Sequence, residues 1–435
     1  MTSKILTPLL SCILASLLVG IGCGDDDGAQ NTMTGGRSGS GGSSVATGGS
    51  PDSQGGAPGS SSGALYALTS NVWGPDGATG YLYTVPLLEE GVADLGSAIE
   101  LPGGAWLTGN PGEPYVYVSS GEGGPTITRY AVGSDGSLSK GATINFAALG
   151  LTNGMRFGTA PMISETKGYL VDAERYRIAT WNPQTMKVGK LIQLDIKERD
   201  GITAWIPAVA VRGERAFVSV SWEKDWTFGK ASQLIVINTT TDEVIETHDE
   251  ARCEQLAISS RASDGTVYFS PYAHSAVARL AFGNGYGTAS CGLRIAPSSD
   301  GPDGAWEVDL SALAGGRPAG EFVLASDDVA FFRAFYDESV GITADNWQDK
   351  SGEPGYRWWR WEIGSATAEE IPGQDLTVEA AHYVVDGKTY VGNPSADWAE
   401  TIITELNKAG ELRPGLRVQG TPGGVVRVDA GAKSK

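Results

Sequence analysis

Aromatic and acidic residues occur together in several Gly- and Asp-rich segments of this 435-residue chain. A tryptophan or tyrosine ring beside a carboxylate can bind a planar or cationic ligand, and the same residue types anchor protein interfaces. Rings on surface loops are costly in water unless something covers them. We therefore interpret the following residues as candidates for binding a ligand or a partner: Trp73, Trp222, Trp226, Asp225, Tyr336, Trp347 and Trp398.

A purely structural interpretation of the same residues stays open. The rings would then cap the ends of strands by packing one loop against the next, without binding anything. The segments concerned are 71–80, 222–230, 273–290, 336–355 and 395–400, and they add the carboxylates of Glu223, Asp337, Asp345 and Asp397.

The sequence offers few residues for catalysis. Its three histidines, His248, His274 and His382, fall in an outer strand, a loop and an inner strand of the predicted fold, so we do not expect a three-histidine metal site. No Gly-rich phosphate loop leads from a strand into a helix, and no GxSxG motif is present. We predict no catalytic residue, no metal site and no cofactor.

Short β-type runs separated by Gly, Asp, Asn and Pro must position the candidate residues, since helical periodicity is nearly absent. One unit of about 50 residues recurs seven times, which is typical of a seven-bladed β-propeller, an all-β fold. Its plainest example is 168–189, GYLVDAERYRIATWNPQTMKVG, which reads as strand, short loop, strand and turn. The strands that we place second in each blade are 64–70, 114–120, 167–173, 215–221, 266–272, 329–335 and 388–394.

The register of the units predicts how the ring closes. Five of the second strands follow an apolar run that fits the innermost strand of a blade, but the first unit has no such run upstream. The chain ends with an unassigned strand at 424–430, GVVRVDA. We predict that this strand fills the innermost position of blade one and so removes an exposed sheet edge.

The cysteines help to fix the register of blade five. Cys253 and Cys291 are the two that remain in the predicted exported domain, where a disulfide is the expected state. If 276–282 were the third strand of this blade, the two thiols would lie at opposite ends. If 291–297 is the third strand and 305–311 the outer one, the thiols lie at one end, and we prefer this register.

The N-terminal region predicts export and anchoring. Residues 1–22 have one lysine followed by an apolar run, as in a signal peptide. The ending LLVGIGC resembles the lipobox of bacterial lipoproteins and makes Cys23 the predicted lipidation site, although an ordinary secretory signal stays an alternative. We assign 23–63 as the lipidated cysteine with a Gly/Ser-rich flexible tether, 64–430 as the propeller, and 431–435 as a tail.

Net charge limits the classes of partner. The formal net charge is −19 and there is no basic patch, so we expect no nucleic-acid partner. We expect a monomer that lies in the bacterial envelope, held at the outer membrane through its lipid, on its periplasmic or outer side. Its other partner would be a siderophore or a receptor protein.

Two family resemblances support this assignment. Segments such as 127–141, ITRYAVGSDGSLSKG, resemble propellers of the lactonase and quinoprotein-dehydrogenase-like kind. That resemblance implies the fold over most of 64–430. Lactonase relatives carry His, Glu and Arg around the channel, and we do not find that set in this sequence.

At a finer level, FGTAPMISETKGYLVDAERYRIATWNPQTMKVGKLIQLD and CGLRIAPSSDGPDGAWEVDLSALAGG resemble exported lipoproteins found with siderophore-uptake systems of myxobacteria, such as the myxochelin cluster. The resemblance implies an envelope binding protein with a role in iron or siderophore handling.

We expect, first, a lipoprotein whose propeller binds a ligand or a partner without catalysis. The alternative is a propeller hydrolase such as a lactonase that acts through carboxylates at the channel mouth. A buried His or a carboxylate–Arg group at that mouth would favour the hydrolase. A third hypothesis is a structural or adhesive envelope component.

Overall fold

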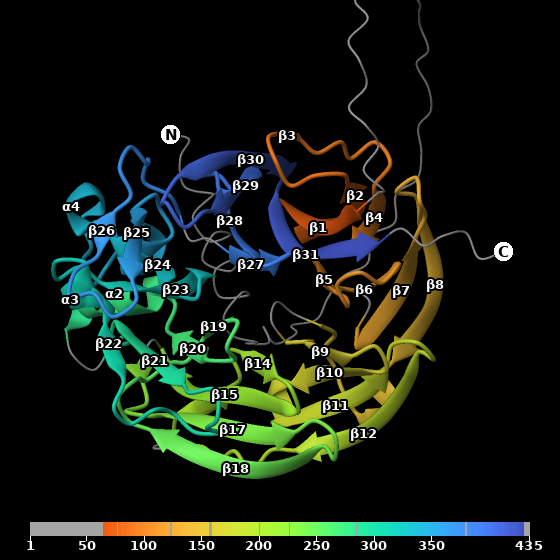
Figure 1. Cartoon of the computed structure of the whole chain (residues 1–435), viewed down its shortest axis with the longest axis horizontal. Coiled ribbons are helices and arrows are strands. Elements are labelled where there is room, and N and C mark those ends of the chain that lie inside the picture. The colour runs from red at the N-terminus through yellow and green to blue at the C-terminus, as the bar shows by residue number, and fades with distance from the viewer. Residues whose placement is uncertain are drawn as a thin grey trace, which may run out of the picture.

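The computed structural model describes residues 64–429 except 76, 122–123, 156–158, 200, 226, 284–285 and 379–380. The predicted signal peptide, Cys23, the tether and the tail lie outside the described residues. Seven β-sheets follow one another around a central axis like the blades of a propeller (Figure 1). The predicted fold class, an all-β seven-bladed propeller, is confirmed.

Blade one shows how the ring closes. Its order from the channel outward is β31 (Thr421–Asp429), β1 (Ala64–Gly74), β2 (Gly77–Val85) and β4 (Ile99–Pro102). The C-terminal strand pairs antiparallel with β1, with Leu65 opposite Val428 and Leu68 opposite Val425. The predicted closure by the strand at 424–430 is therefore confirmed, with the strand beginning three residues earlier.

A second closure lies on the outer side of the ring and was not predicted. The connection between β2 and β4 contains β3 (Gly91–Val92), which pairs in parallel with β30 (Leu412–Gln419) of blade seven. Blade one thus takes its innermost strand from the chain end and lends a short outermost strand to blade seven. The junction between the first and last blades is held at both its inner and outer edges.

The other blades follow the chain in order, each running outward from the channel. The seven strands placed second from the sequence all occupy that position, as β1, β6, β10, β15, β20, β24 and β28. Blades two and three consist of β5 (Ala105–Thr108), β6 (Tyr115–Ser120), β7 (Thr126–Val132), β8 (Leu138–Asn145), β9 (Met162–Ser164), β10 (Lys167–Asp172), β11 (Arg177–Asn182) and β12 (Lys187–Gln193).

Blade four has a divided inner strand, and blade five is the smallest in strand content. Their strands are β13 (Thr203–Trp205), β14 (Val209–Arg212), β15 (Arg215–Lys224), β16 (Thr227–Phe228), β17 (Ser232–Asn238), β18 (Glu243–Glu250), β19 (Ile258–Arg261), β20 (Val267–Ser270), β21 (Cys291–Ile295) and β22 (Glu307–Asp309).

Blades six and seven complete the ring. They consist of β23 (Ala319–Ser326), β24 (Val329–Phe335), β25 (Tyr356–Glu362), β26 (Glu369–Glu370), β27 (Ala381–Val385), β28 (Lys388–Pro394), β29 (Glu400–Leu406) and β30. The helical segments are η2 (Ala147–Leu149), η3 (Ala173–Arg175), α2 (Ala273–Phe282), α3 (Leu310–Leu313), α4 (Asp337–Val340) and α5 (Trp347–Ser351).

Blade five has the register that the cysteines favoured. Its third strand is β21, which begins at Cys291, and residues 276–282 belong to helix α2. Cys253 and Cys291 are joined by a disulfide with a Cα–Cα distance of 5.9 Å. The bond ties the segment before β19 to the start of the third strand.

The hydrophobic core is divided among the blade interfaces. Tyr169 of blade three packs in one cluster with Val218 of blade four, and Phe217 on the opposite face of β15 packs with Phe269 of blade five. Similar clusters lie between each other pair of neighbouring blades. Second strands are consequently apolar on both faces, and all seven side chains of β24 are buried.

The strand order defines two faces of the ring. We call the face that carries the connections from second to third strands the upper face. Because β1 is a second strand and β31 an innermost strand, Ala64 and Asp429 both lie at the opposite, lower face. The described chain therefore enters and leaves the ring on the face that does not carry α2, α4 and α5.

Close backbone approach at the closing strand supplies a stability test. A Cβ atom on Gly423 would overlap the carbonyl oxygen of Ala105 in blade two. We expect Gly423→Ala to lower the free energy of unfolding by about 3 kcal/mol, since the overlapping atom belongs to backbone that cannot give way. Urea denaturation measures the effect. Gly304→Ala, whose Cβ meets no heavy atom within 4 Å, is the control and should change stability by less than about 1 kcal/mol. Equal stability of the two variants would contradict the described closure.

Candidate functional site

The upper face is unevenly built. The connections from second to third strand carry helices in blades five and six, namely α2 in blade five and α4 and α5 in blade six. Ala273 and Val277 of α2 are buried against Phe335 and Tyr356 of blade six, so the blade-five helix also covers its neighbour (Figure 1). By contrast, the corresponding connection of blade three is the single turn η3.

An apolar surface is exposed at the C-terminal end of α2. Leu280, Phe282 and Tyr286 are 41%, 38% and 40% exposed. The ring centroids of Phe282 and Tyr286 lie 4.9 Å apart, and the Phe282 ring meets the edge of Trp347 from α5 at 5.9 Å. We call Leu280, Phe282 and Tyr286 the aromatic shelf. Neighbouring exposed apolar side chains on the surface of a soluble protein are typical of binding surfaces.

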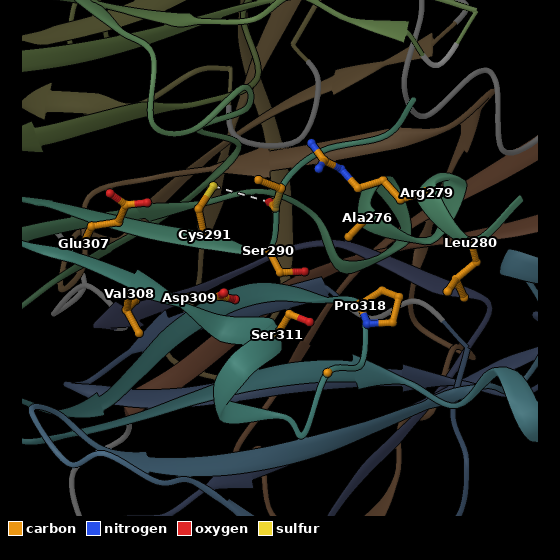
Figure 2. A pocket seen from close by; sticks show the side chains of 12 residues that line it. Ala276, Arg279, Leu280, Ser290, Cys291, Glu307, Val308, Asp309, Ser311 and Pro318 are labelled. Atoms are coloured by element: carbon orange, nitrogen blue, oxygen red, sulfur yellow. Dashed lines mark hydrogen bonds between the residues drawn. The ribbon is translucent and has the colours of Figure 1, made fainter. Parts of the chain in front are cut away.

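A cavity of about 370 Å³ adjoins the shelf and shares Leu280 with it (Figure 2). It lies at the upper ends of β21 and β22, so it is on the outer part of blade five rather than at the channel mouth. We call it the blade-five cavity. Its lining consists of Ala276, Arg279, Leu280, Ala289, Ser290, Cys291, Glu307, Val308, Asp309, Ser311, Gly316 and Pro318.

The charges around this cavity are predominantly negative. The Arg279 guanidinium donates to Glu254 at 2.8 Å, and the other oxygen of that carboxylate accepts from the Ala289 N–H at 2.9 Å. Glu307 and Asp309 are exposed at the cavity. The Arg252 guanidinium interacts with Glu307 but forms its ion pair with Glu250 at 2.5 Å. One Asp309 oxygen accepts from the Ala312 N–H at 3.0 Å and caps α3.

Two of the predicted tryptophans are buried. The Trp222 indole donates to the Lys197 carbonyl at 2.8 Å, and the Arg199 guanidinium lies 3.8 Å from its ring centroid. Trp347 on α5 is also buried, and its ring contacts that of Phe282. Both tryptophans pack the blade ends, as in the structural interpretation, and Trp347 in addition contacts the aromatic shelf through Phe282.

The remaining predicted residues are spread around the ring. Trp73 of blade one is half-buried and donates to the Thr421 hydroxyl at 3.2 Å. Asp225 of blade four is exposed, and Trp398 of blade seven is half-buried in a turn that begins at Ser395. Trp226 lies outside the described residues. The structure therefore does not bring the predicted set together at one place.

Tyr336 is buried between two arginines of blade six. Its ring centroid lies 4.0 Å from the Arg317 guanidinium and 4.9 Å from that of Arg357. Its hydroxyl donates to Glu370 at 2.5 Å and accepts from the Trp359 indole at 3.1 Å. Burial, together with the hydrogen bond to Glu370, raises the pKa of Tyr336 to about 12. This phenol stays neutral and stabilises the blade rather than offering a reactive group.

A buried ion pair near the channel side of blade six was missed from the sequence. Arg333 on β24 donates to Glu321 on β23 at 2.9 Å, and both side chains are almost fully buried. The same guanidinium donates to Thr377 at 3.2 Å and to the Val378 carbonyl, so it fixes the connection into blade seven. An arginine inside the apolar run VAFFRAF was the available signal, because arginine is buried only when it is paired. Neither residue lines the blade-five cavity or a second cavity between the innermost strands of blades seven, one and two.

The histidines occupy separate environments. His248 on β18 bonds Glu246 at 2.9 Å, and His274 on α2 stacks against Tyr272 at 5.3 Å. His382 lies on β27, the innermost strand of blade seven. Within the part of the chain that the structure describes, no group of three His, Cys, Asp or Glu residues could hold a metal ion. In the same part, no helix is long and apolar enough to cross a membrane.

A second cavity, of about 260 Å³, lies between the innermost strands of blades seven, one and two. Val384, Val425, Val426 and Leu107 line it, and Asp386 stands at its lower end, where it pairs with Arg427 at 3.1 Å. The close-packed glycines of β31, Gly423 and Gly424, form part of its wall. Its polar side chains have partners within the fold, since the Thr108 hydroxyl donates to the Ala160 carbonyl at 2.9 Å and Asp386 accepts from Arg427, and we regard this cavity as part of the packing around the channel.

His382 gives the fold a pH dependence. Burial lowers the pKa of His382 to about 4, against a backbone hydrogen bond with Ser259 that acts in the opposite direction. The unfolded chain therefore takes up this proton first, and stability is lost as the pH falls from about 6.5 towards 4. We expect His382→Asn to reduce the stability difference between pH 7 and pH 4.5 by up to about 2 kcal/mol. Urea midpoints at both pH values measure it, and His248→Asn is the control. An unchanged difference in His382→Asn would show that this imidazole does not stay neutral in the fold.

The similarity of this chain to known proteins lies in its fold. No protein-family model matches the chain. No curated protein matches it. Among solved structures, the periplasmic gluconolactonase of Pseudomonas aeruginosa is similar with a TM-score of 0.55 at 11% identity, covering 84% of this chain and 100% of that one. A putative 6-phosphogluconolactonase from Bacteroides fragilis is similar with a TM-score of 0.50 at 12% identity, covering 85% and 98%. These similarities support the propeller fold.

Proposed function

We propose that this protein is a binding propeller of the bacterial cell envelope, and that it holds a ligand or a partner protein at the upper face of blades five and six. The observation that carries the proposal is the aromatic shelf beside the blade-five cavity. Three large apolar side chains stay exposed on the upper face next to a cavity. Covering such a surface with a partner removes apolar area from water and so favours binding.

The topology of the ring supports an envelope role. If Cys23 carries a lipid, the tether of about 40 residues joins the ring at Ala64, on its lower face. The aromatic shelf lies on the opposite face of the ring, so the attachment point of the tether does not cover it.

Iron or siderophore handling is a narrower form of the same proposal, and it comes from the resemblance to myxobacterial lipoproteins. The aromatic rings of a catecholate chelate could stack on Phe282 and Tyr286. The carboxylates of Glu307 and Asp309 oppose an anionic ferric complex, however. Charge therefore favours a neutral or cationic ligand over an anionic one at this place.

Lactonase-type hydrolysis is the second candidate, and the buried Glu321–Arg333 pair is the observation in its favour. A carboxylate–Arg group near the channel was the feature expected of an enzyme. The Arg333 guanidinium, however, donates its hydrogen bonds to Glu321, Thr377 and the Val378 carbonyl, which all belong to the fold itself. That arrangement fits a structural pair better than a group that meets substrate, so binding remains the preferred function.

The binding proposal predicts that ligand-induced stabilisation depends on the shelf. Thermal unfolding would be followed with ferric ion, ferric catecholate and hydroxamate siderophores, and lactones as probes. We expect the double variant Phe282→Ser with Tyr286→Ser to lose at least about 1.4 kcal/mol of binding free energy, or tenfold in affinity, for any probe that stabilises the wild type.

The control removes equally exposed apolar residues elsewhere. Val244 and Ile245 on β18 are 40% and 39% exposed, and their replacement by Ser should leave binding intact. Turnover of a lactone that depends on Glu321 or Arg333 would favour the hydrolase instead.

Anchoring is tested separately from binding. We expect the full chain to take up labelled palmitate in its native host or in Escherichia coli, and we expect Cys23→Ser to abolish the label and release the domain from membranes, because the acyl chains contribute about 0.8 kcal/mol per buried CH₂. Cys12→Ser is the matched control within the signal peptide and should retain the label. Label retained in Cys23→Ser would exclude this cysteine as the lipidation site.

A further inference from the structure

We propose that the blade-five cavity binds a positively charged side chain, lysine or arginine, of a partner protein, while neighbouring apolar residues of that partner cover the aromatic shelf. This inference rests on the proposed binding function and names the chemistry of its partner.

The first argument is the balance of charge in the cavity. Its one cationic side chain, Arg279, is neutralised by Glu254 at 2.8 Å. Glu307 and Asp309 remain exposed at the cavity, and Arg252, the cation that interacts with Glu307, is itself paired with Glu250 at 2.5 Å. An incoming cation therefore meets two carboxylates, whereas an incoming anion is repelled.

The second argument is geometric. Asp309 and Glu307 are two residues apart on β22, so their side chains leave the strand on the same side. The N–H of Ala312 fixes the Asp309 side chain through one oxygen, Oδ1, and the other oxygen stays available to accept from a ligand. A guanidinium or ammonium group carries several donors and suits a pair of carboxylate acceptors.

The third argument is the size and polarity of the cavity. A volume of about 370 Å³ lies at the lower end of the roughly 300–1,000 Å³ range of small-molecule sites, which suits one long side chain better than a ferric chelate. Ala276, Ala289 and Pro318 supply apolar wall beside the charged groups. Lysine and arginine have an apolar stem and a charged tip, and they bury the stem against such a wall.

The fourth argument concerns the shelf and selects a protein as the partner. Phe282 and Tyr286 extend the apolar surface beyond the cavity, where a free amine or amino acid would leave them in water. A polypeptide that places a cationic residue in the cavity can cover both rings with its neighbouring side chains. Aromatic anchors beside charged groups are typical of protein interfaces.

The experiment uses three labelled peptides of about 12 residues as probes. The first combines Leu with Lys in an amphipathic pattern, the second has Gln for every Lys, and the third has Glu for every Lys. Fluorescence anisotropy at low and at physiological ionic strength gives the affinities. We expect the Lys peptide to bind the wild-type domain at least tenfold more tightly than the Gln peptide, the Glu peptide not to bind, and the preference to weaken with salt.

Two variants locate the interaction. In Glu307→Gln with Asp309→Asn, the side chains keep their shape and Asn still caps α3, so the fold should persist. We expect this variant to lose the tenfold preference for the Lys peptide. The control, Glu243→Gln with Glu246→Gln on β18, removes the same charge from the outer edge of blade four and should keep the preference. This comparison separates the cavity from general attraction to an acidic protein.

The outcomes also separate this inference from the proposed function. If Phe282→Ser with Tyr286→Ser abolishes binding but the carboxylate variant does not, the shelf binds and the cationic partner is wrong. If lysine amide or arginine amide displaces the peptide and binds as tightly as the peptide does, the site takes small cations and the prediction of a protein partner is wrong. If no peptide binds in a manner that depends on either pair, both the inference and the proposed site are overturned.

Discussion

A ring of blades has no core at its centre, so each sheet is stabilised only by the two sheets that flank it. The hydrophobic clusters follow this rule, with one between each pair of neighbouring blades. The first and last blades would lack one such neighbour if the ring stayed open. Pairing of β31 with β1 supplies that neighbour from inside, and pairing of β3 with β30 secures it from outside. Blades one and seven thereby gain the same burial on both faces as the blades between them.

A closed ring leaves the upper face free to vary, because the blade interfaces are built mainly from strand side chains. In blade three this connection is one turn, whereas in blades five and six it has grown into helices that pack on one another. The disulfide Cys253–Cys291 fixes the start of β21, which follows α2 in the chain, and the contact between Phe282 and Trp347 joins α2 to α5. Rigid support of a few exposed residues is the usual basis of a precise binding site. The proposed function follows from this division between a uniform ring and a local elaboration.

The blades are more predictable from the sequence than the candidate binding site. The seven second strands, the closing strand and the register of blade five were predictable, because each depends on local alternation and on a repeat that occurs seven times. The aromatic shelf was not predicted, because Phe282 and Tyr286 stand among small residues in 273–290, a segment that contains no tryptophan. Helical spacing of apolar residues within 273–282 was the signal that could have revealed α2. Exposure decides which ring can bind, and Trp222 and Tyr336 are buried by arginines that are distant in sequence or lie on another strand.

The architecture of the described chain is predictable from the order of its residues, because period, strand polarity and turn residues are local properties that repeat. The acidic character and the two cysteines available for a bond in the domain are likewise visible in the sequence. Which polar groups meet depends on the packing of the blades, since the Glu321–Arg333 pair joins two strands and an inter-blade connection. The tertiary structure likewise decided that Glu307 and Asp309 face a cavity beneath α2, because the helix comes from a connection that the strand pattern does not position. Contacts between segments depend on how the blades are packed, and that packing is not written in any one repeat.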